Sequence, residues 1–280
     1  MLKLKLTRKT AIALTCFIAV LWSLAGLNIK LINWNPYSIA AGRSIVAVLI
    51  LIPAIAKCKD IKINRYVIGG AVCYAAFNYC FNISVKLATS ALAILMQYVA
   101  PVYVAILAWL FLKERITKAD IACIAVVLAG MIIFFLGSEG GGSPIGKIFA
   151  VCNGITFAGI SIFLRLQKNG NPVMSMFLGN VISGLIGIPI IVSTGLPDIR
   201  SLFFLLLAGF LCAFTYALYA VASKYLTALE TVLLPILDPV LNPVWVFLFL
   251  GEAPTALSVI GFAIVLVSVT SKTIYSLKCE

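Results

Sequence analysis

The chain contains no histidine, and only 11% of its 280 residues are charged, against roughly 25% in a typical soluble domain. The missing histidine excludes His-based metal sites and Ser–His catalytic pairs. The sequence also has no CxxC pair, no Gly-rich phosphate loop and no obvious carboxylate dyad. We therefore expect no enzyme activity, no metal site and no cofactor.

Apolar residues are abundant instead: 63% of the chain is hydrophobic, and the mean hydropathy is +1.14. A water-soluble fold cannot bury so much apolar surface, whereas a lipid bilayer solvates it. The net charge of +12 would suit a nucleic-acid partner, but the basic residues lie at the ends of apolar runs and form no patch with interleaved aromatics. The composition predicts an all-α integral membrane protein whose macromolecular partner is the bilayer, with no nucleic acid.

Ten apolar runs reach the roughly 20 residues that a membrane-spanning helix needs. The expected spans are 10–29, 37–56, 66–85, 89–111, 119–136, 145–165, 173–193, 202–222, 226–250 and 256–275. The first follows basic residues, as in a signal peptide, but it continues to Leu27 with no small-residue cleavage site before a soluble domain. We expect it to be retained as a helix.

The placement of lysine and arginine predicts the orientation, because cytoplasmic loops collect positive charge. With a cytoplasmic N-terminus, the connections on the outer side keep few basic residues, namely Lys30, Lys86, Lys147 and Arg200. Ten spans bring the C-terminus back to the same side. We expect a multi-pass protein of the cell (inner or plasma) membrane with both termini cytoplasmic.

The sequence repeats itself at a fixed offset around the fourth and ninth spans. The matched polar residues pair Lys86 with Lys224, Thr89 with Thr227, Pro101 with Pro239, and Glu114 with Glu252. The halves, 1–138 and 139–280, have five spans each, so the second half must enter the membrane from the opposite side. Such inverted repeats are typical of secondary transporters. A duplicated scaffold without transport is the alternative.

The same segments carry a family resemblance. In each half, a small or acidic residue precedes a proline in mid-span, and an apolar run then ends at a glutamate. The pattern runs from Ala100-Pro101 to Glu114 and from Asp238-Pro239 to Glu252. It resembles the EamA-type repeat of the drug/metabolite transporter superfamily. The resemblance implies a ten-helix basket with a central substrate cavity lined mainly by spans 1, 3, 4, 6, 8 and 9. It leaves the substrate open among amino acids, nucleotide sugars, amines and other metabolites.

The ninth span carries the strongest candidate site. Pro235, Pro239 and Pro243 recur every four residues, so we expect a kinked or locally open helix. Asp238 lies in mid-span, with Asn242 one turn further on the same face. A charge at the bilayer centre costs at least about 2.5–3.5 kcal/mol. Asp238 therefore either binds a cationic substrate group, carries a coupling proton, or caps the broken helix.

Other polar residues on the spans are weaker candidates for substrate binding. Glu230 is either a second cation site or an interfacial residue beside Lys224. Asn78 and Asn82, one turn apart, either face a cavity or join helices to one another. Arg43, which lies well inside the second span, either extends to the outer surface or pairs with an anionic group.

The remaining candidates are a glutamine and four aromatic residues. Gln97 and Tyr98 precede the fourth-span proline and share its depth. Trp22, inside the first span, is a plausible cavity wall. Tyr216 and Tyr219 of the eighth span either stack on a substrate or pack in the protein.

Together these features predict a secondary transporter that moves a small polar metabolite across the cytoplasmic membrane by alternating access, coupled to protons or to a gradient. An amine or amino acid is favoured, because the ninth span carries two acids against one deep arginine. The alternative is a flippase for a lipid-linked or amphiphilic substrate. The expected assembly is a monomer or homodimer.

Overall fold

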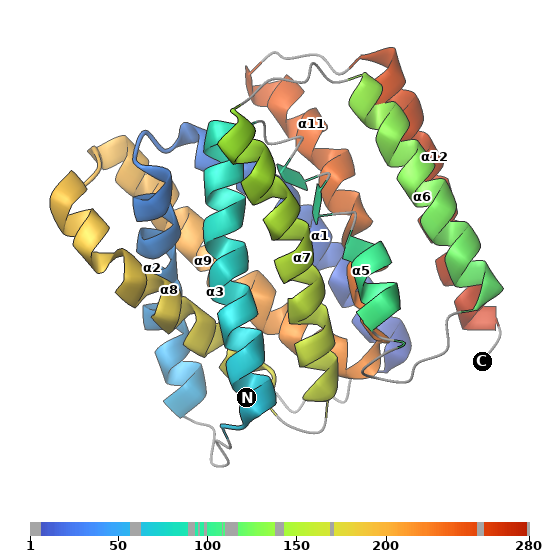
Figure 1. Ribbon diagram of the computed structural model, residues 1–280, viewed down its shortest axis with the longest axis horizontal. Coiled ribbons are helices and arrows are strands. Elements are labelled where there is room, and N and C mark those ends of the chain that lie inside the picture. The colour runs from blue at the N-terminus through green and yellow to red at the C-terminus, as the bar shows by residue number, and fades with distance from the viewer. Residues whose placement is uncertain are drawn as a thin grey trace.

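The computed structural model describes residues 7–56, 63–88, 93–94, 96–97, 100–107, 109, 117–137, 143–168, 171–250 and 255–278. Every regular element in these ranges is helical (Figure 1). The helices of the first half are α1 (Arg8–Leu31), α2 (Pro36–Ala56), α3 (Arg65–Leu87), α5 (Ala100–Leu107) and α6 (Lys118–Leu136). Those of the second half are α7 (Pro144–Leu166), α8 (Val173–Thr194), α9 (Ile199–Ala222), α10 (Ala228–Leu233), α11 (Leu237–Leu250) and α12 (Ala256–Lys278).

Six of these helices are long and apolar enough to cross a membrane, within the described ranges: α1, α2, α3, α7, α8 and α9. The all-helical, multi-pass membrane class is therefore confirmed. Helices α5, α6, α11 and α12 lie within the other apolar runs of the sequence. The count of ten spans stays a prediction.

Polar side chains define where several helices begin. At these starts, the side chain of the residue that precedes the helix accepts a hydrogen bond from a backbone N–H of the first turn. The capping residues are Thr7, Asn64, Ser143, Asp198 and Thr227. At α9, hydrogen bonds from Ser201 lower the pKa of Asp198, so a charged carboxylate faces the positive end of the helix. These caps lie in the short polar connections, which explains why the observed helices start within a few residues of the expected spans.

The two halves pack against each other in matching pairs. In chain order, α1, α2, α3, α5 and α6 correspond to α7, α8, α9, α11 and α12. Helix α3 packs on α7 as α9 packs on α1, and α3 packs on α8 as α9 packs on α2. The corresponding helices α2 and α8 contact each other, as do α6 and α12. This exchange of partners is the arrangement expected of two related repeats.

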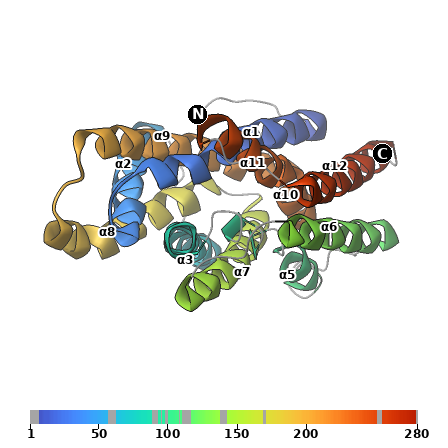
Figure 2. The ribbon, with the colours of Figure 1, turned by 90° about the horizontal axis from the view of Figure 1, so that it is seen from above.

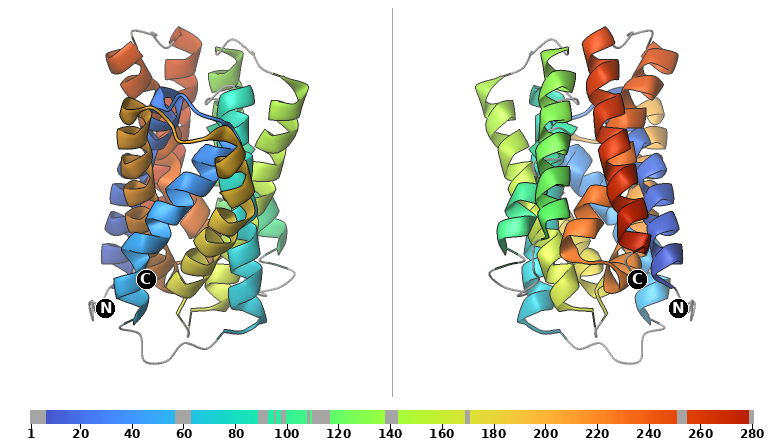
Figure 3. Two further views of the ribbon diagram at one scale, coloured as in Figure 1. Left: turned by 90° about the vertical axis from the view of Figure 1, so that its left-hand side faces the viewer. Right: turned by 90° about the vertical axis from the view of Figure 1, so that its right-hand side faces the viewer.

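The views from other sides show how the helices are distributed. Helices α2, α8 and α9 lie at one side of the molecule, and α5, α6 and α12 at the other, with α1, α3, α7 and α11 between them (Figure 2). The start of α1 and the end of α12 lie at the same end of the bundle (Figure 3). An even number of crossings produces this placement.

The ninth span is broken, as its prolines predict. Helix α10 ends at Leu233, a 3₁₀ turn occupies Leu234–Ile236, and α11 starts at Leu237. Pro235 lies within the turn and is buried. Because proline supplies no N–H for the regular helical bond, the chain changes helix type at this point.

Candidate functional site

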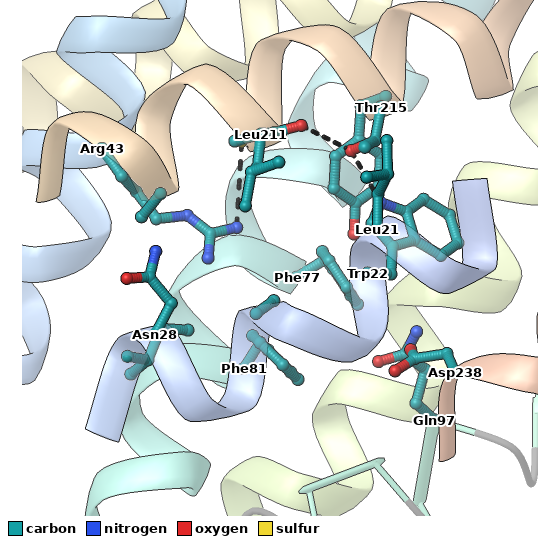
Figure 4. Close-up of a pocket in the computed structure, with 15 residues that line it drawn as sticks. Leu21, Trp22, Asn28, Arg43, Phe77, Phe81, Gln97, Leu211, Thr215 and Asp238 are labelled. Carbon is teal, nitrogen blue, oxygen red and sulfur yellow. Dashed lines mark hydrogen bonds between the residues drawn. The ribbon is translucent and has the colours of Figure 1, made fainter. Parts of the chain in front are cut away.

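A cavity lies where α1, α2, α3, α9 and α11 meet (Figure 4). About 500 Å³ of empty space, open solvent included, lies between its lining atoms, and about 30 Å³ of that admits the centre of a water molecule. The cavity is therefore narrow in this conformation.

The cavity has charged side chains at two ends and rings between them. Arg43 of α2 lies at one end, whereas Asp238 of α11 and Gln97 lie at the other (Figure 4). Phe77 and Phe81 of α3 form part of the wall between these ends. The site thus offers a guanidinium, a carboxyl group and an apolar middle section.

Asp238 is buried, with 5% of its surface exposed. It belongs to the first turn of α11, directly after the 3₁₀ turn. The positive end of a helix stabilises a carboxylate there, which offsets part of the cost of burying its charge. The break in the span therefore places this acid both at a helix start and on the cavity wall.

Asn242, one turn after Asp238, holds α11 against α1. Its side-chain Nδ2 donates to the Ser23 carbonyl oxygen over 2.9 Å. The Trp245 indole Nε1 donates to the Ser23 hydroxyl over 2.7 Å. The two helices approach closely at Gly26, where an added Cβ would lie 2.6 Å from Asn242 Nδ2. Asn242 is buried but is not part of the cavity lining.

An aromatic cluster closes one side of the cavity. Trp22 of α1 and Tyr216 of α9 both line it, with ring centroids 4.8 Å apart. The Trp22 indole N–H donates to the Thr215 hydroxyl over 2.8 Å. Tyr219 lies behind Trp22, and its hydroxyl donates to the Thr231 carbonyl oxygen over 3.0 Å. These bonds fix the rings in place.

Asn78 and Asn82 lie outside the cavity lining and act as links between helices. Asn78 Nδ2 donates to the Ala40 carbonyl oxygen, to the Ser44 hydroxyl over 2.6 Å and to the Ser183 hydroxyl over 2.8 Å. It therefore joins α3 to both α2 and α8. Asn82 Nδ2 donates to the backbone carbonyl oxygen and to the side-chain Oδ1 of Asn78.

Glu230 also lies outside the cavity lining. One carboxylate oxygen accepts from the Thr227 backbone N–H, which completes a capping box at the start of α10. The other oxygen forms an ion pair with Arg8 of α1. Tyr98, Glu114 and Glu252 lie outside the described residues.

The structure rules out one of the two alternatives that the sequence left open for Arg43. Its side chain does not extend to the outer surface: it is 4% exposed and lines the cavity. A single arginine within an apolar run was the available signal, but the pattern around it does not show which way the side chain points. The set of lining helices also differs from the one that the resemblance implied. Among the described residues, α7 supplies no lining residue, because its Phe157 packs behind Trp22 with ring centroids 6.1 Å apart.

The long apolar helices are those of a multi-pass membrane protein, and comparison with known proteins identifies its family. The pattern of the EamA-like transporter family matches residues 9–136 and again 144–271. The chain therefore belongs to the EamA-like transporter family, whose members are transporters and not enzymes.

Two further proteins are similar to this chain. An uncharacterized transporter of Clostridium kluyveri is 25% identical over 261 aligned residues, which cover 83% of this chain and 82% of that protein. A solved crystal structure matches with a TM-score of 0.79 at 19% identity, covering 98% of this chain and all of that one. At this identity the crystal structure supports the fold alone.

Proposed function

We propose that the protein is a secondary transporter that moves a small polar metabolite with a cationic group, an amine or an amino acid, across the cell membrane by alternating access. The observation that carries the proposal is Asp238, a buried carboxylate on the cavity wall at the break of the ninth span. Acids inside a membrane protein are costly, and they commonly mark substrate or proton pathways.

The broken span supports a moving element at this site. Helices α10 and α11 meet at a 3₁₀ turn with Pro235, so the two segments are not held together by one continuous ladder of hydrogen bonds. A change of angle at the turn moves Asp238 relative to α1 and α9. Access to the acid then alternates between the two membrane faces, and binding of substrate or of a proton at Asp238 couples to the motion.

Substitution Asp238→Asn tests this function. The change removes the charge with little change in volume. We expect substrate flux into proteoliposomes to fall at least about tenfold, as the loss of a buried charge-assisted contact implies, and its pH dependence to flatten. The matched control is Asp198→Asn at the exposed cap of α9, where asparagine caps equally well and flux should be unchanged. Unchanged flux and pH dependence in Asp238→Asn would refute the assignment.

A flippase for an amphiphilic or lipid-linked substrate is the alternative within the same fold. Uptake of a labelled water-soluble amine or amino acid by proteoliposomes of plain phospholipid supports the proposed function. Movement of a labelled lipid between leaflets, with no uptake of solute, would favour the flippase.

A further inference from the structure

Arg43 is a buried cation whose charge is not balanced within the described protein. It is 4% exposed, and it forms no ion pair with any residue that the structure describes. Its one hydrogen-bonding contact there is a long one of 3.9 Å from Nη2 to Cys212 Sγ, and its Nε has no hydrogen-bond partner. A guanidinium presents five N–H donors, so most of its binding capacity is unused.

An unbalanced arginine at this depth is costly, and such residues in membrane proteins commonly mark ligand pathways. The Cys212 thiol lies beside Arg43, and the hydroxyl of Tyr74 lies 2.9 Å from that thiol; neither residue is a carboxylate. Since Arg43 lines the cavity, its unused donors are available to a bound molecule. A planar carboxylate fits them best, because it accepts two parallel N–H bonds from the guanidinium.

Asn28 adds an acceptor at the same end of the cavity (Figure 4). Its Nδ2 donates to the Phe204 carbonyl oxygen over 3.1 Å, which fixes the orientation of the carboxamide. Its Oδ1 is buried without a hydrogen-bond partner. An anion site made of arginine alone would not need this oxygen, whereas an ammonium group next to the carboxylate would donate to it.

The far end of the cavity sets the length of the ligand. Asp238 and Arg43 do not form an ion pair, and the rings of Phe77 and Phe81 lie between their ends of the cavity (Figure 4). A molecule that reaches both needs its charged groups at opposite ends of an apolar chain. We propose that the Arg43–Asn28 end binds the carboxylate and ammonium of an α-amino acid while Asp238 binds a cation at the end of its side chain, so that the substrate is a basic amino acid of the lysine type. This inference rests on the proposed function.

Three probes of similar length test each end separately: L-lysine, cadaverine, which lacks the carboxylate, and L-norleucine, which lacks the terminal ammonium. Binding is measured by calorimetry on the full chain in nanodiscs. We expect lysine to bind at least about tenfold more tightly than either probe, since each lost contact is a charge-assisted one. In Arg43→Gln, the affinity for lysine should fall to that for cadaverine, while cadaverine itself binds unchanged.

Two further variants serve as controls for the effect of Arg43→Gln. Arg43→Lys keeps the charge without the planar fork and should restore part of the preference for lysine over cadaverine. Arg65→Gln removes an exposed arginine that stacks on Tyr66, and it should bind all three probes as the wild type does. Both variants also show that a substituted protein still folds and binds.

The outcomes separate this inference from the proposed function. If cadaverine binds as tightly as lysine, or if Arg43→Gln retains the preference for lysine, the carboxylate subsite is refuted while cation binding at Asp238 stands. If lysine and cadaverine both fail to bind the wild type, the basic amino acid assignment is refuted, and the flux measurement with Asp238→Asn still decides the proposed function.

Discussion

Buried polar residues in this protein fall into two groups by what they contact. Asn78, Asn153 and Tyr219 donate to backbone or hydroxyl groups of neighbouring helices. Such bonds hold helices together inside a bilayer, where apolar contacts alone give little preference for protein over lipid. Arg43 and Asp238 differ from these residues in that they line the cavity. The second group is the one to associate with a ligand.

Glu230 belongs with the structural group, and this assignment is testable. In Glu230→Gln, the single remaining side-chain oxygen cannot serve both Arg8 and the Thr227 N–H. We expect a loss of about 1 kcal/mol in stability, and hence a melting temperature lower by about 2–4 °C. Substrate affinity should not change. A fall in affinity comparable to that in Asp238→Asn would place Glu230 in the binding site.

The sequence predicts local structure best where a residue's covalent structure restricts the backbone, as proline does. Pro235 supplies no N–H for a regular helical bond, so a break beside Asp238 could be predicted, although Pro239 and Pro243 lie within α11. The sequence does not predict what Asn78 and Arg43 contact, because the direction in which a side chain points depends on how its helix packs. The same amide faces a cavity or a neighbouring helix according to how the helix is rotated, and the rotation of α2 and α3 is set by contacts between the two halves.

Among the elements, α7 has a supporting role that its sequence does not reveal. Asn153 Nδ2 donates to the Ala93 carbonyl oxygen over 3.0 Å. The adjacent Gly154 lies so close to the Met96 carbonyl oxygen that an added Cβ would overlap it. Helix α7 thus fixes the segment that carries Gln97 into the cavity.

The glycine contact predicts the effect of a single added methyl group. Gly154→Ala should displace the segment at Met96, because backbone atoms cannot rotate away as side chains do. We expect a destabilisation of about 1–3 kcal/mol, seen as a lower melting temperature, together with weaker substrate binding. Gly184→Ala is the control, since its Cβ would meet a side-chain atom of Ile45 at 3.1 Å. Equal melting temperatures for the two variants would contradict this role.

The limits of the helices were largely predictable from hydropathy and from the polar connections. The expected span 173–193 corresponds to α8, and 202–222 lies within α9, which starts earlier because Asp198 caps it. The division of span 226–250 into three segments was predicted as a break but not located to Leu234–Ile236. Hydropathy averages over a whole turn, so it does not resolve a three-residue change in helix type.

At the scale of the whole molecule, the orientation in the membrane follows from the charge distribution and is open to a direct test. The start of α1 and the end of α12 lie at one end, and the 195–198 connection lies at the other (Figure 3). Epitope tags at both termini should be hidden from antibody in intact cells, whereas a tag inserted at 195–198 should be accessible. Antibody binding to either terminal tag on sealed cells would show that the predicted topology is inverted or wrong.

The matched packing of the two halves has an energetic consequence. Because the main helix pairs between the halves have counterparts with the roles exchanged, interchanging the conformations of the halves would yield a second structure made of similar contacts. The two structures would be equal in free energy if the halves were identical. If the protein alternates between two such structures, as proposed, the equilibrium constant between them is set by the positions at which the halves differ, such as Ala100 in the first half and Asp238 at the corresponding position of the second. A few such residues, together with bound substrate, are sufficient to shift the populations, since a change of 1.4 kcal/mol alters the ratio about tenfold.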